Sequence, residues 1–170
     1  MTPVDQAGED PWLLHLSYFK PHWPYIAPEP YHSMYGPDQV LPANRSVEEL
    51  ANAHPVHRAF ADSRVGKAFQ RDEVREAVVP TYMGLVKQCD DQMGRLFGYL
   101  DRTGRMDDTM IVLTSDHGDY LGDHWMGEKD QFHAPSVRMP LIIYDPSPEA
   151  DAARGTVCEE LVEALGLAPT

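Results

Sequence analysis

The chain has 170 residues, of which 42% are hydrophobic, and its 27 acidic and 14 basic residues give a formal net charge of −13. This length can bury a core as one domain, and the apolar content exceeds that of disordered segments. The acidic balance argues against a broad nucleic-acid interface, since a phosphate backbone requires a basic face. A small anionic ligand remains compatible, because a lysine, a histidine and a bound metal reverse the charge locally.

The sequence has no run of 18 apolar residues, so no membrane span is expected. The opening residues, MTPVD, lack the basic and apolar regions of a signal peptide, which predicts a cytoplasmic protein. Cys89 and Cys158 lie in no recognisable motif and are expected to be reduced thiols.

The first predicted element is a buried strand at residues 12–19 (WLLHLSYF), which is apolar and rich in aromatic side chains. Prolines in the next segment, residues 21–32, disfavour a helix and predict extended or turn conformations. Residues 46–61 are predicted to form a broken helix, with Ser46 as the N-cap and Pro55 as the interruption.

Residues 72–102 carry the clearest helical periodicity in the sequence. Asp72 and Glu73 suit the helix start, Gly104 suits the end, and Pro80 predicts a kink or a boundary between two helices. The apolar residues form one stripe, which we interpret as a core-facing surface and not a cofactor site: Val78, Tyr82, Leu85, Cys89, Met93, Leu96, Phe97 and Leu100.

Two short apolar runs, residues 109–114 (TMIVLT) and 140–144 (PLIIY), are predicted to be strands. Because both are almost continuously apolar, they are expected to be parallel strands covered on both faces. Residues 158–165 are weakly helical. The order of elements indicates an α/β fold, a mostly parallel sheet flanked by helices, in a single domain over residues 1–170.

The candidate site lies in residues 113–133 (LTSDHGDYLGDHWMGEKDQFH), directly after the strand predicted at 109–114. In open α/β sheets, binding sites form beyond the carboxyl ends of strands. Asp116 offers a carboxylate and His117 an imidazole, a pair that suits Mn, Zn or Fe, and Ca less well. Gly118 allows a sharp turn and a close approach of the backbone.

His124 and Lys129 follow in the same segment. A lysine and a histidine beside a metal stabilise the negative charge that develops on an oxyanion ester in its transition state. Taken singly, these residues also have structural interpretations. Asp116 suits a turn or a helix cap, Lys129 a solvated surface charge, and His133 a packing or loop-ordering role. The joint pattern of strand, S-D-H-G, L-G-D-H, lysine and second strand favours the site.

That joint pattern resembles the C-terminal part of the sulfatase family within the alkaline phosphatase superfamily. It is most similar to the phosphonate monoester hydrolases and their arylsulfatase relatives. Residues 14–25 (LHLSYFKPHWPY) resemble the family's strand ending in P-H-x-P, and residues 82–101 resemble its long helix. T-S-D-H-G, L-G-D-H and Lys129 resemble its metal and substrate loop.

The resemblance implies an alkaline-phosphatase-like fold and a metal-dependent hydrolase of sulfate, phosphonate or phosphate monoesters. It implies that Asp116 and His117 are metal ligands, with manganese or calcium as the expected ion. Many sulfatases have asparagine in place of His117 and hold calcium, whereas imidazole favours manganese. By the same resemblance, His22 and Lys129 are catalytic and bind the oxygens of the transferred group, and His124 is a substrate-side or loop-ordering residue.

The family's nucleophile, in a C-x-P-S-R motif matured to formylglycine or a T-x-P-S-R motif, is not found in this sequence. The paired aspartates that complete the metal site are not found either. The chain is therefore expected to be a domain fragment with half of an active site, partnered by a missing N-terminal half or by self-association. One alternative is a non-catalytic remnant or partner-dependent module that binds a metal or anions. A second is a phosphodiesterase or phosphomutase of the same superfamily, which the spacing of P-H-x-P and L-G-D-H disfavours.

Overall fold

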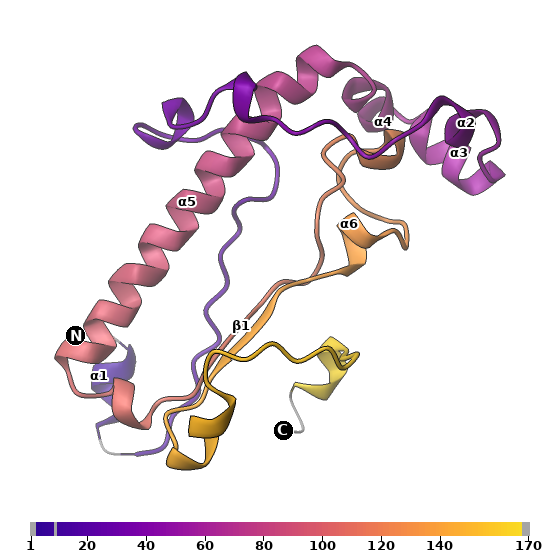
Figure 1. Ribbon diagram of the computed structural model, residues 1–170. Helices are drawn as coiled ribbons and strands as arrows, with labels where there is room; N and C mark the ends of the chain where they lie inside the picture. The colour runs from indigo at the N-terminus through magenta and orange to yellow at the C-terminus, as the bar shows by residue number, and fades with distance from the viewer. Residues whose placement is uncertain (1–2, 9, 168–170) are drawn as a thin grey trace.

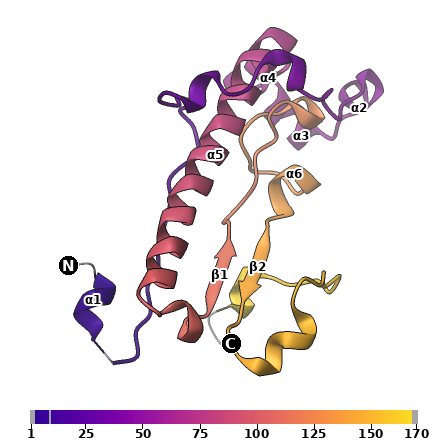
Figure 2. The same ribbon diagram turned by 60° about the vertical axis from the view of Figure 1, so that its left-hand side comes forward.

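The computed structural model describes residues 3–8 and 10–167 (Figure 1). One long helix, α5 (Asp72–Arg102), runs along the molecule, and a ribbon of two strands, β1 (Ile111–Thr114) and β2 (Leu141–Tyr144), lies beside it (Figures 1 and 2). The other α-helices are short: α1 (Pro3–Ala7), α2 (Val47–Ala51), α3 (Pro55–Ala61), α4 (Arg64–Phe69) and α6 (Ala134–Val137). Single 3-10 turns complete the described chain: η1 (Tyr31–Ser33), η2 (Pro37–Gln39), η3 (Met106–Asp108), η4 (Asp123–Trp125), η5 (Pro148–Ala153) and η6 (Ala164–Gly166).

The helix predicted over residues 72–102 is confirmed as α5. Pro80 lies inside α5 and does not divide it, and its side chain is buried. The apolar stripe is most deeply buried near the middle of the helix, where Leu85 is fully buried, and near its C-terminal end, where Leu100 is 3% exposed. The long helix is therefore a rigid element along which the rest of the chain is arranged.

Gly84 lies where α5 meets the turn at Tyr31, and a Cβ atom added to it would stand 2.1 Å from the Tyr31 carbonyl oxygen. Gly94, in the same helix, has no atom within 4 Å of its Cβ position. We expect Gly84→Ala to lower the free energy of unfolding by about 2–3 kcal/mol, because the helix and the turn must separate. Gly94→Ala should raise it by about 0.5–1 kcal/mol, because alanine favours a helix. Urea unfolding followed by circular dichroism checks both, and a stabilised Gly84→Ala protein would contradict the close contact.

The broken helix predicted over residues 46–61 is also confirmed. The Ser46 hydroxyl accepts a hydrogen bond of 3.0 Å from the Glu49 amide and begins α2, while Pro55 is the first residue of α3. Proline is favoured at this position because the first amide of a helix has no partner within the helix. These caps fix the place of Glu49 on α2.

Residues 109–114 and 140–144 form strands as predicted, but their direction corrects the expected parallel pairing. β1 and β2 are antiparallel, with Val112 opposite Ile143 and Leu113 opposite Ile142. The chain between them returns to the same end of β1 through a loop and α6, and it contains no helix long enough for a parallel crossover. A continuously apolar strand sequence indicates that both faces of the strand must be covered, but it does not determine whether the strand pairs in a parallel or an antiparallel direction.

The strand predicted at residues 12–19 is not paired in the described chain. The segment is extended, but it has no ladder, and Leu13 and Phe19 are 94% and 67% exposed. The prediction of a buried strand is therefore wrong for this segment, because apolar character alone does not form a strand, which also needs a neighbouring edge to pair with. The weak helix predicted at 158–165 is not formed as such: residues 158–163 have no regular secondary structure, and only the last two residues of the range lie in a helical turn, η6.

The structure exposes more surface than its mass predicts. Its accessible area is 12,080 Å², and a compact folded monomer of 19.2 kDa exposes about 8,400 Å². The buried apolar side chains are few and lie mainly where α3, α4 and α5 meet the segment after β1: Ala61, Phe69, Leu85, Leu100, Tyr120 and Met126. The core of the described chain is therefore built around the candidate loop.

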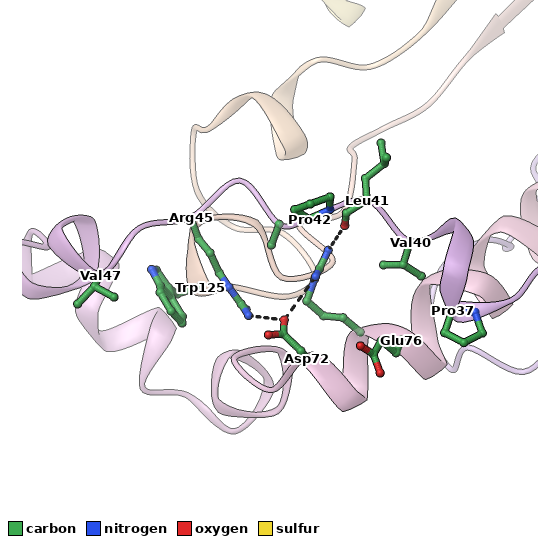
Figure 3. Close-up of a pocket in the computed structure, with 11 residues that line it drawn as sticks. Pro37, Val40, Leu41, Pro42, Arg45, Val47, Asp72, Glu76 and Trp125 are labelled. Atoms are coloured by element: carbon green, nitrogen blue, oxygen red, sulfur yellow. Dashed lines mark hydrogen bonds and ion pairs between the residues drawn. The ribbon is translucent and has the colours of Figure 1, made fainter.

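Arg75 connects α5 to the segments on either side of it. Its guanidinium donates to the carbonyl oxygens of Leu121 at 3.0 Å and Leu41 at 2.9 Å, and it lies 3.5 Å from Asp72. Asp72 also pairs with Arg45 at 2.7 Å, across a cavity of about 510 Å³ (Figure 3). Both arginines that line this cavity are already bound to groups of the chain itself. We therefore assign them a structural role, which is to hold the loop after β1 in place.

Candidate functional site

Asp116 and His117 directly follow the end of β1, as the sequence predicts. The Asp116 carboxylate is 87% exposed, and its Oδ2 lies 3.6 Å from His117 Nε2. His117 Nδ1 lies 2.7 Å from the Gly118 carbonyl oxygen, which can only accept, so Nδ1 carries the hydrogen. The lone pair of the ring therefore lies on Nε2, on the side of Asp116.

This pair offers two donors of kinds that divalent cations bind, a carboxylate oxygen and an imidazole nitrogen. A neutral imidazole whose second nitrogen donates to a carbonyl is the usual arrangement of a metal-binding histidine. Two ligands held about 2.1 Å from one ion lie roughly 3–3.5 Å apart, close to the separation observed here. Because the Asp116 carboxylate is exposed, an ion bound there could take further ligands from other groups.

Gly118 brings the backbone of this loop against the segment before β2. Its amide donates to the Ser136 carbonyl at 2.9 Å, and an added Cβ would stand 1.9 Å from the Pro135 oxygen. Only glycine fits such an approach. The close backbone approach predicted at Gly118 is therefore made to Pro135 of the same chain.

His22 and Lys129, which are 107 positions apart, are in direct contact. Lys129 Nζ lies 2.9 Å from His22 Nε2. An ammonium can only donate, so Nε2 accepts, and His22 Nδ1 donates to the Trp23 carbonyl at 2.9 Å. The His22 and His117 rings lie 5.9 Å apart between centroids. The structure thus brings together Asp116, His117, His22 and Lys129, which we call the strand-end group.

The loop that carries Lys129 is fastened by Asp119. One carboxylate oxygen accepts from the amides of Leu121 and Glu128, each at 3.1 Å, and the other accepts from the Tyr25 hydroxyl at 2.7 Å. Burial raises the pKa of Asp119, although these hydrogen bonds oppose the shift. Burial, followed by the neighbouring Asp119 charge, raises the pKa of Tyr25. Asp119 therefore ties the Lys129 loop to the segment that carries His22.

The same loop holds an unusual backbone. Five residues other than glycine have positive φ angles: Leu121, His124, Trp125, Glu128 and Asp130. Each such residue costs on the order of 1 kcal/mol and persists only where surrounding contacts determine it. Asp119 and Arg75 supply such contacts, so the position of Lys129 depends on them.

We expect Asp119→Ala to lower the free energy of unfolding by about 3 kcal/mol, because two partly buried amides and a tyrosine hydroxyl lose their acceptor. Asp119→Asn is the matched control. Its amide oxygen still accepts from both backbone amides and its NH₂ group can donate to Tyr25, so a change below about 1 kcal/mol is expected. Chemical unfolding of both variants measures the difference, and equal losses would show that charge, and not hydrogen bonding, holds the loop.

His124 belongs to a second group of side chains, which includes Glu49 and His133. Its Nδ1 lies 2.5 Å from a Glu49 carboxylate oxygen, and its ring stacks on His133 with centroids 4.2 Å apart. Tyr120 reaches His133 Nδ1 at 2.9 Å, and His57 Nε2 donates to the His124 carbonyl at 2.9 Å. The pKa of His133 is lowered, first by burial and then by the neighbouring histidines.

The sequence patterns predict no role for Glu49 or His57, and for His133 they predict only a packing or loop-ordering role. These residues come from α2, α3 and the start of α6, and no sequence spacing relates them. Only the folding of the loop after β1 back onto α2 brings them to His124.

The family model described as Sulfatase matches residues 2–170. The chain belongs to the sulfatase family. The multifunctional alkaline phosphatase superfamily protein PehA of Trinickia caryophylli is 38% identical over all of this chain and 35% of its own length. An arylsulfatase of Clostridium perfringens is 30% identical over 94% of this chain and 33% of its own length.

Solved structures agree with the family assignment. The phosphonate monoester hydrolase of Agrobacterium radiobacter matches 84% of this sulfatase-family chain with a TM-score of 0.75 and 35% identity. The enzyme SpPMH from Silicibacter pomeroyi matches 85% with a TM-score of 0.73 and 31% identity. These matches confirm the expected alkaline-phosphatase-like α/β fold. The chain spans about a third of the length of these relatives, since it covers 30–31% of the two structures.

The family comprises sulfuric ester and phosphonate monoester hydrolases, and its metal dependence gives the exposed donors of Asp116 and His117 a chemical context. In the part of the chain that the structure describes, no helix has the length and apolar character needed to cross a membrane.

Proposed function

We propose that this chain supplies the strand-end part of the active site of a hydrolase that cleaves sulfate, phosphonate or phosphate monoesters. The observation that carries the proposal is the contact series from Asp116 through His117 and His22 to Lys129. This series places the proposed metal-ligating atoms of Asp116 and His117 close to the positively charged ammonium of Lys129. An oxyanion ester needs both, because a metal must be held and negative charge must be stabilised.

In this proposal Asp116 and His117 hold a divalent ion, manganese or calcium. The imidazole ligand favours manganese. When bound, the ion supplies Lewis-acid stabilisation of the ester oxygens. The free Nε2 of His117 and the exposed carboxylate of Asp116 support this assignment.

Lys129 and His22 are proposed to contact the oxygens of the transferred sulfuryl or phosphoryl group. The ammonium of Lys129 has three hydrogens, of which one is directed to His22 in the structure. The others remain to bind an ester oxygen and to stabilise the leaving group. His22 holds the ammonium in place from a proline-bounded segment, in which P-H-W-P restricts the backbone.

The remainder of the active site is proposed to come from a further segment that bears the nucleophile, which is formylglycine in sulfatases. No C-x-P-S-R or T-x-P-S-R motif occurs in these 170 residues. The exposed apolar side chains of the ribbon support packing against such a segment: Val112 at 45%, Ile142 at 61% and Ile143 at 56% exposed. Self-association through the same surface is the competing outcome.

Mn²⁺ binding to the purified chain tests the proposal. Wild type and Asp116→Ala are titrated with Mn²⁺ while electron paramagnetic resonance measures the free ion. We expect Asp116→Ala to weaken binding about 100-fold, because a first ligand is lost. Asp145→Ala, which removes a carboxylate from the turn after β2, is the control and should bind as wild type does. Equal affinities of Asp116→Ala and wild type would contradict the assignment.

A further inference from the structure

A second group of metal-ligating side chains lies apart from the strand-end group. Glu49, His124 and His133 each place one ligand atom within 4.8 Å of the other two, and all three are partly buried. They come from α2, η4 and the residue that precedes α6. This grouping therefore depends on the fold and on no local sequence motif.

The hydrogen bonds around the group already set which atoms face inward. Tyr120, which is 1% exposed, binds His133 at Nδ1, so Nε2 is the nitrogen that His133 has free. His57 donates to the His124 carbonyl and supports the left-handed backbone of His124, whose φ is 51°. Such outer contacts orient the ligands of metal sites in proteins.

We propose that Glu49, His124 and His133 form a second cation site, separate from Asp116 and His117, for a transition metal of the zinc class. Two imidazoles and one carboxylate make up the three-ligand set of open zinc sites, with a fourth position for water. The same set disfavours calcium and magnesium, which prefer oxygen ligands. The inference goes beyond ester hydrolysis and does not depend on it.

The Glu49 and His124 ligand atoms need only a small adjustment to accept the ion. His124 Nδ1 and the Glu49 oxygen are joined by a hydrogen bond and lie 2.5 Å apart. Ligands about 2.0–2.1 Å from a tetrahedral zinc ion lie roughly 3.3 Å apart, so the two side chains must separate by less than about 1 Å. The ion would replace this hydrogen bond, with His124 bound through Nδ1 and its ring hydrogen on Nε2.

Such an ion would fasten α2 to both ends of the loop that carries Lys129. His124 lies before Lys129 in that loop and His133 after it, while Glu49 lies on α2. The site would thus act as a cross-link that holds the loop, without contact with the ester.

The test uses Co²⁺ and Zn²⁺ on the full chain in an Asp116→Ala, His117→Ala background, which removes the strand-end donors. We expect one equivalent of Co²⁺ to give the visible absorption of a four- or five-coordinate site, and Zn²⁺ to displace it. Added to this background, Glu49→Gln and His133→Gln should each weaken Co²⁺ affinity about 100-fold. His32→Gln, which alters an exposed histidine paired with Glu29, is the matched control and should leave the affinity unchanged.

Circular dichroism of each variant shows whether it folds, and Glu49→Gln is the more conservative change because its amide still reaches His124. If the background protein binds no Co²⁺, or if Glu49→Gln and His133→Gln both bind it as tightly as the background does, the second site is refuted. Failure here leaves the proposed function standing, because Mn²⁺ binding by Asp116 and His117 is measured separately in chains with Glu49 and His133 intact.

Discussion

The purified chain is expected to show no measurable turnover of nitrophenyl sulfate or phenyl phosphonate esters, even with added Mn²⁺. A covalent mechanism that loses its nucleophile falls by about 10⁴ to 10⁶ in rate. The chain carries no C-x-P-S-R or T-x-P-S-R motif, and in the proposed function its strand-end group holds the ion through only two residues, Asp116 and His117. An ion held by so few ligands stabilises the transition state poorly.

The same assay has a positive counterpart. A segment that bears the nucleophile motif and the further metal ligands, taken from a phosphonate monoester hydrolase and supplied fused or in trans, should restore Mn²⁺ affinity and hydrolysis together. Asp116→Ala in the assembled protein should abolish both. Robust hydrolysis by the chain alone that Asp116→Ala abolishes would contradict this prediction, because a nucleophile would then have to lie within the 170 residues.

Elements with a complete local signal could be predicted from the sequence. The bounds of α5 follow from a periodic apolar stripe with acidic residues at its start, and those of β1 and β2 from short β-branched runs. The split between α2 and α3 follows from Ser46 and Pro55, which act through the nearest backbone amides. In each case the physical cause lies within a few residues of its effect.

Features that depend on distant segments could not be predicted in this way. The direction of β2 relative to β1 is set by the path of the intervening chain, and the isolation of residues 12–19 by the lack of a paired edge in the described structure. The adjacency of Asp116 and His117 was visible in the sequence, whereas the contact of His22 with Lys129 came from the family resemblance alone. His22 and Lys129 are 107 positions apart, and nothing in their spacing predicts that they meet.

The place of His124 shows the limit most clearly. The family resemblance suggested a substrate-side or loop-ordering residue, and the positive φ angles at Leu121 and His124 set the path of the loop that carries its ring. The ring consequently meets Glu49 and His133. A left-handed residue other than glycine leaves little trace in a sequence, because surrounding contacts stabilise it and residue type does not.

The second large effect concerns Lys129 in the assembled hydrolase. Lys129→Ala should lower kcat/KM for a phenyl ester by about 10³, because a preorganised cation at a developing negative charge contributes 10²- to 10³-fold or more. Lys87→Ala is the matched control, since Lys87 lies on α5 and pairs with Asp90 and Asp91 at the surface. Its removal should leave kcat/KM within about twofold, as is usual for exposed ion pairs.

Leaving-group chemistry separates the two roles proposed for Lys129. Nitrophenolate is a weak base and departs with little help, whereas phenolate needs its charge stabilised as the ester bond breaks. If Lys129 stabilises the leaving group, Lys129→Ala should therefore cost about tenfold more with phenyl esters than with nitrophenyl esters. Equal losses on both esters would place Lys129 on the oxygens of the transferred group instead. A loss below about tenfold on both would remove it from the active site, and its 2.9 Å contact with His22 would then serve only to hold the loop.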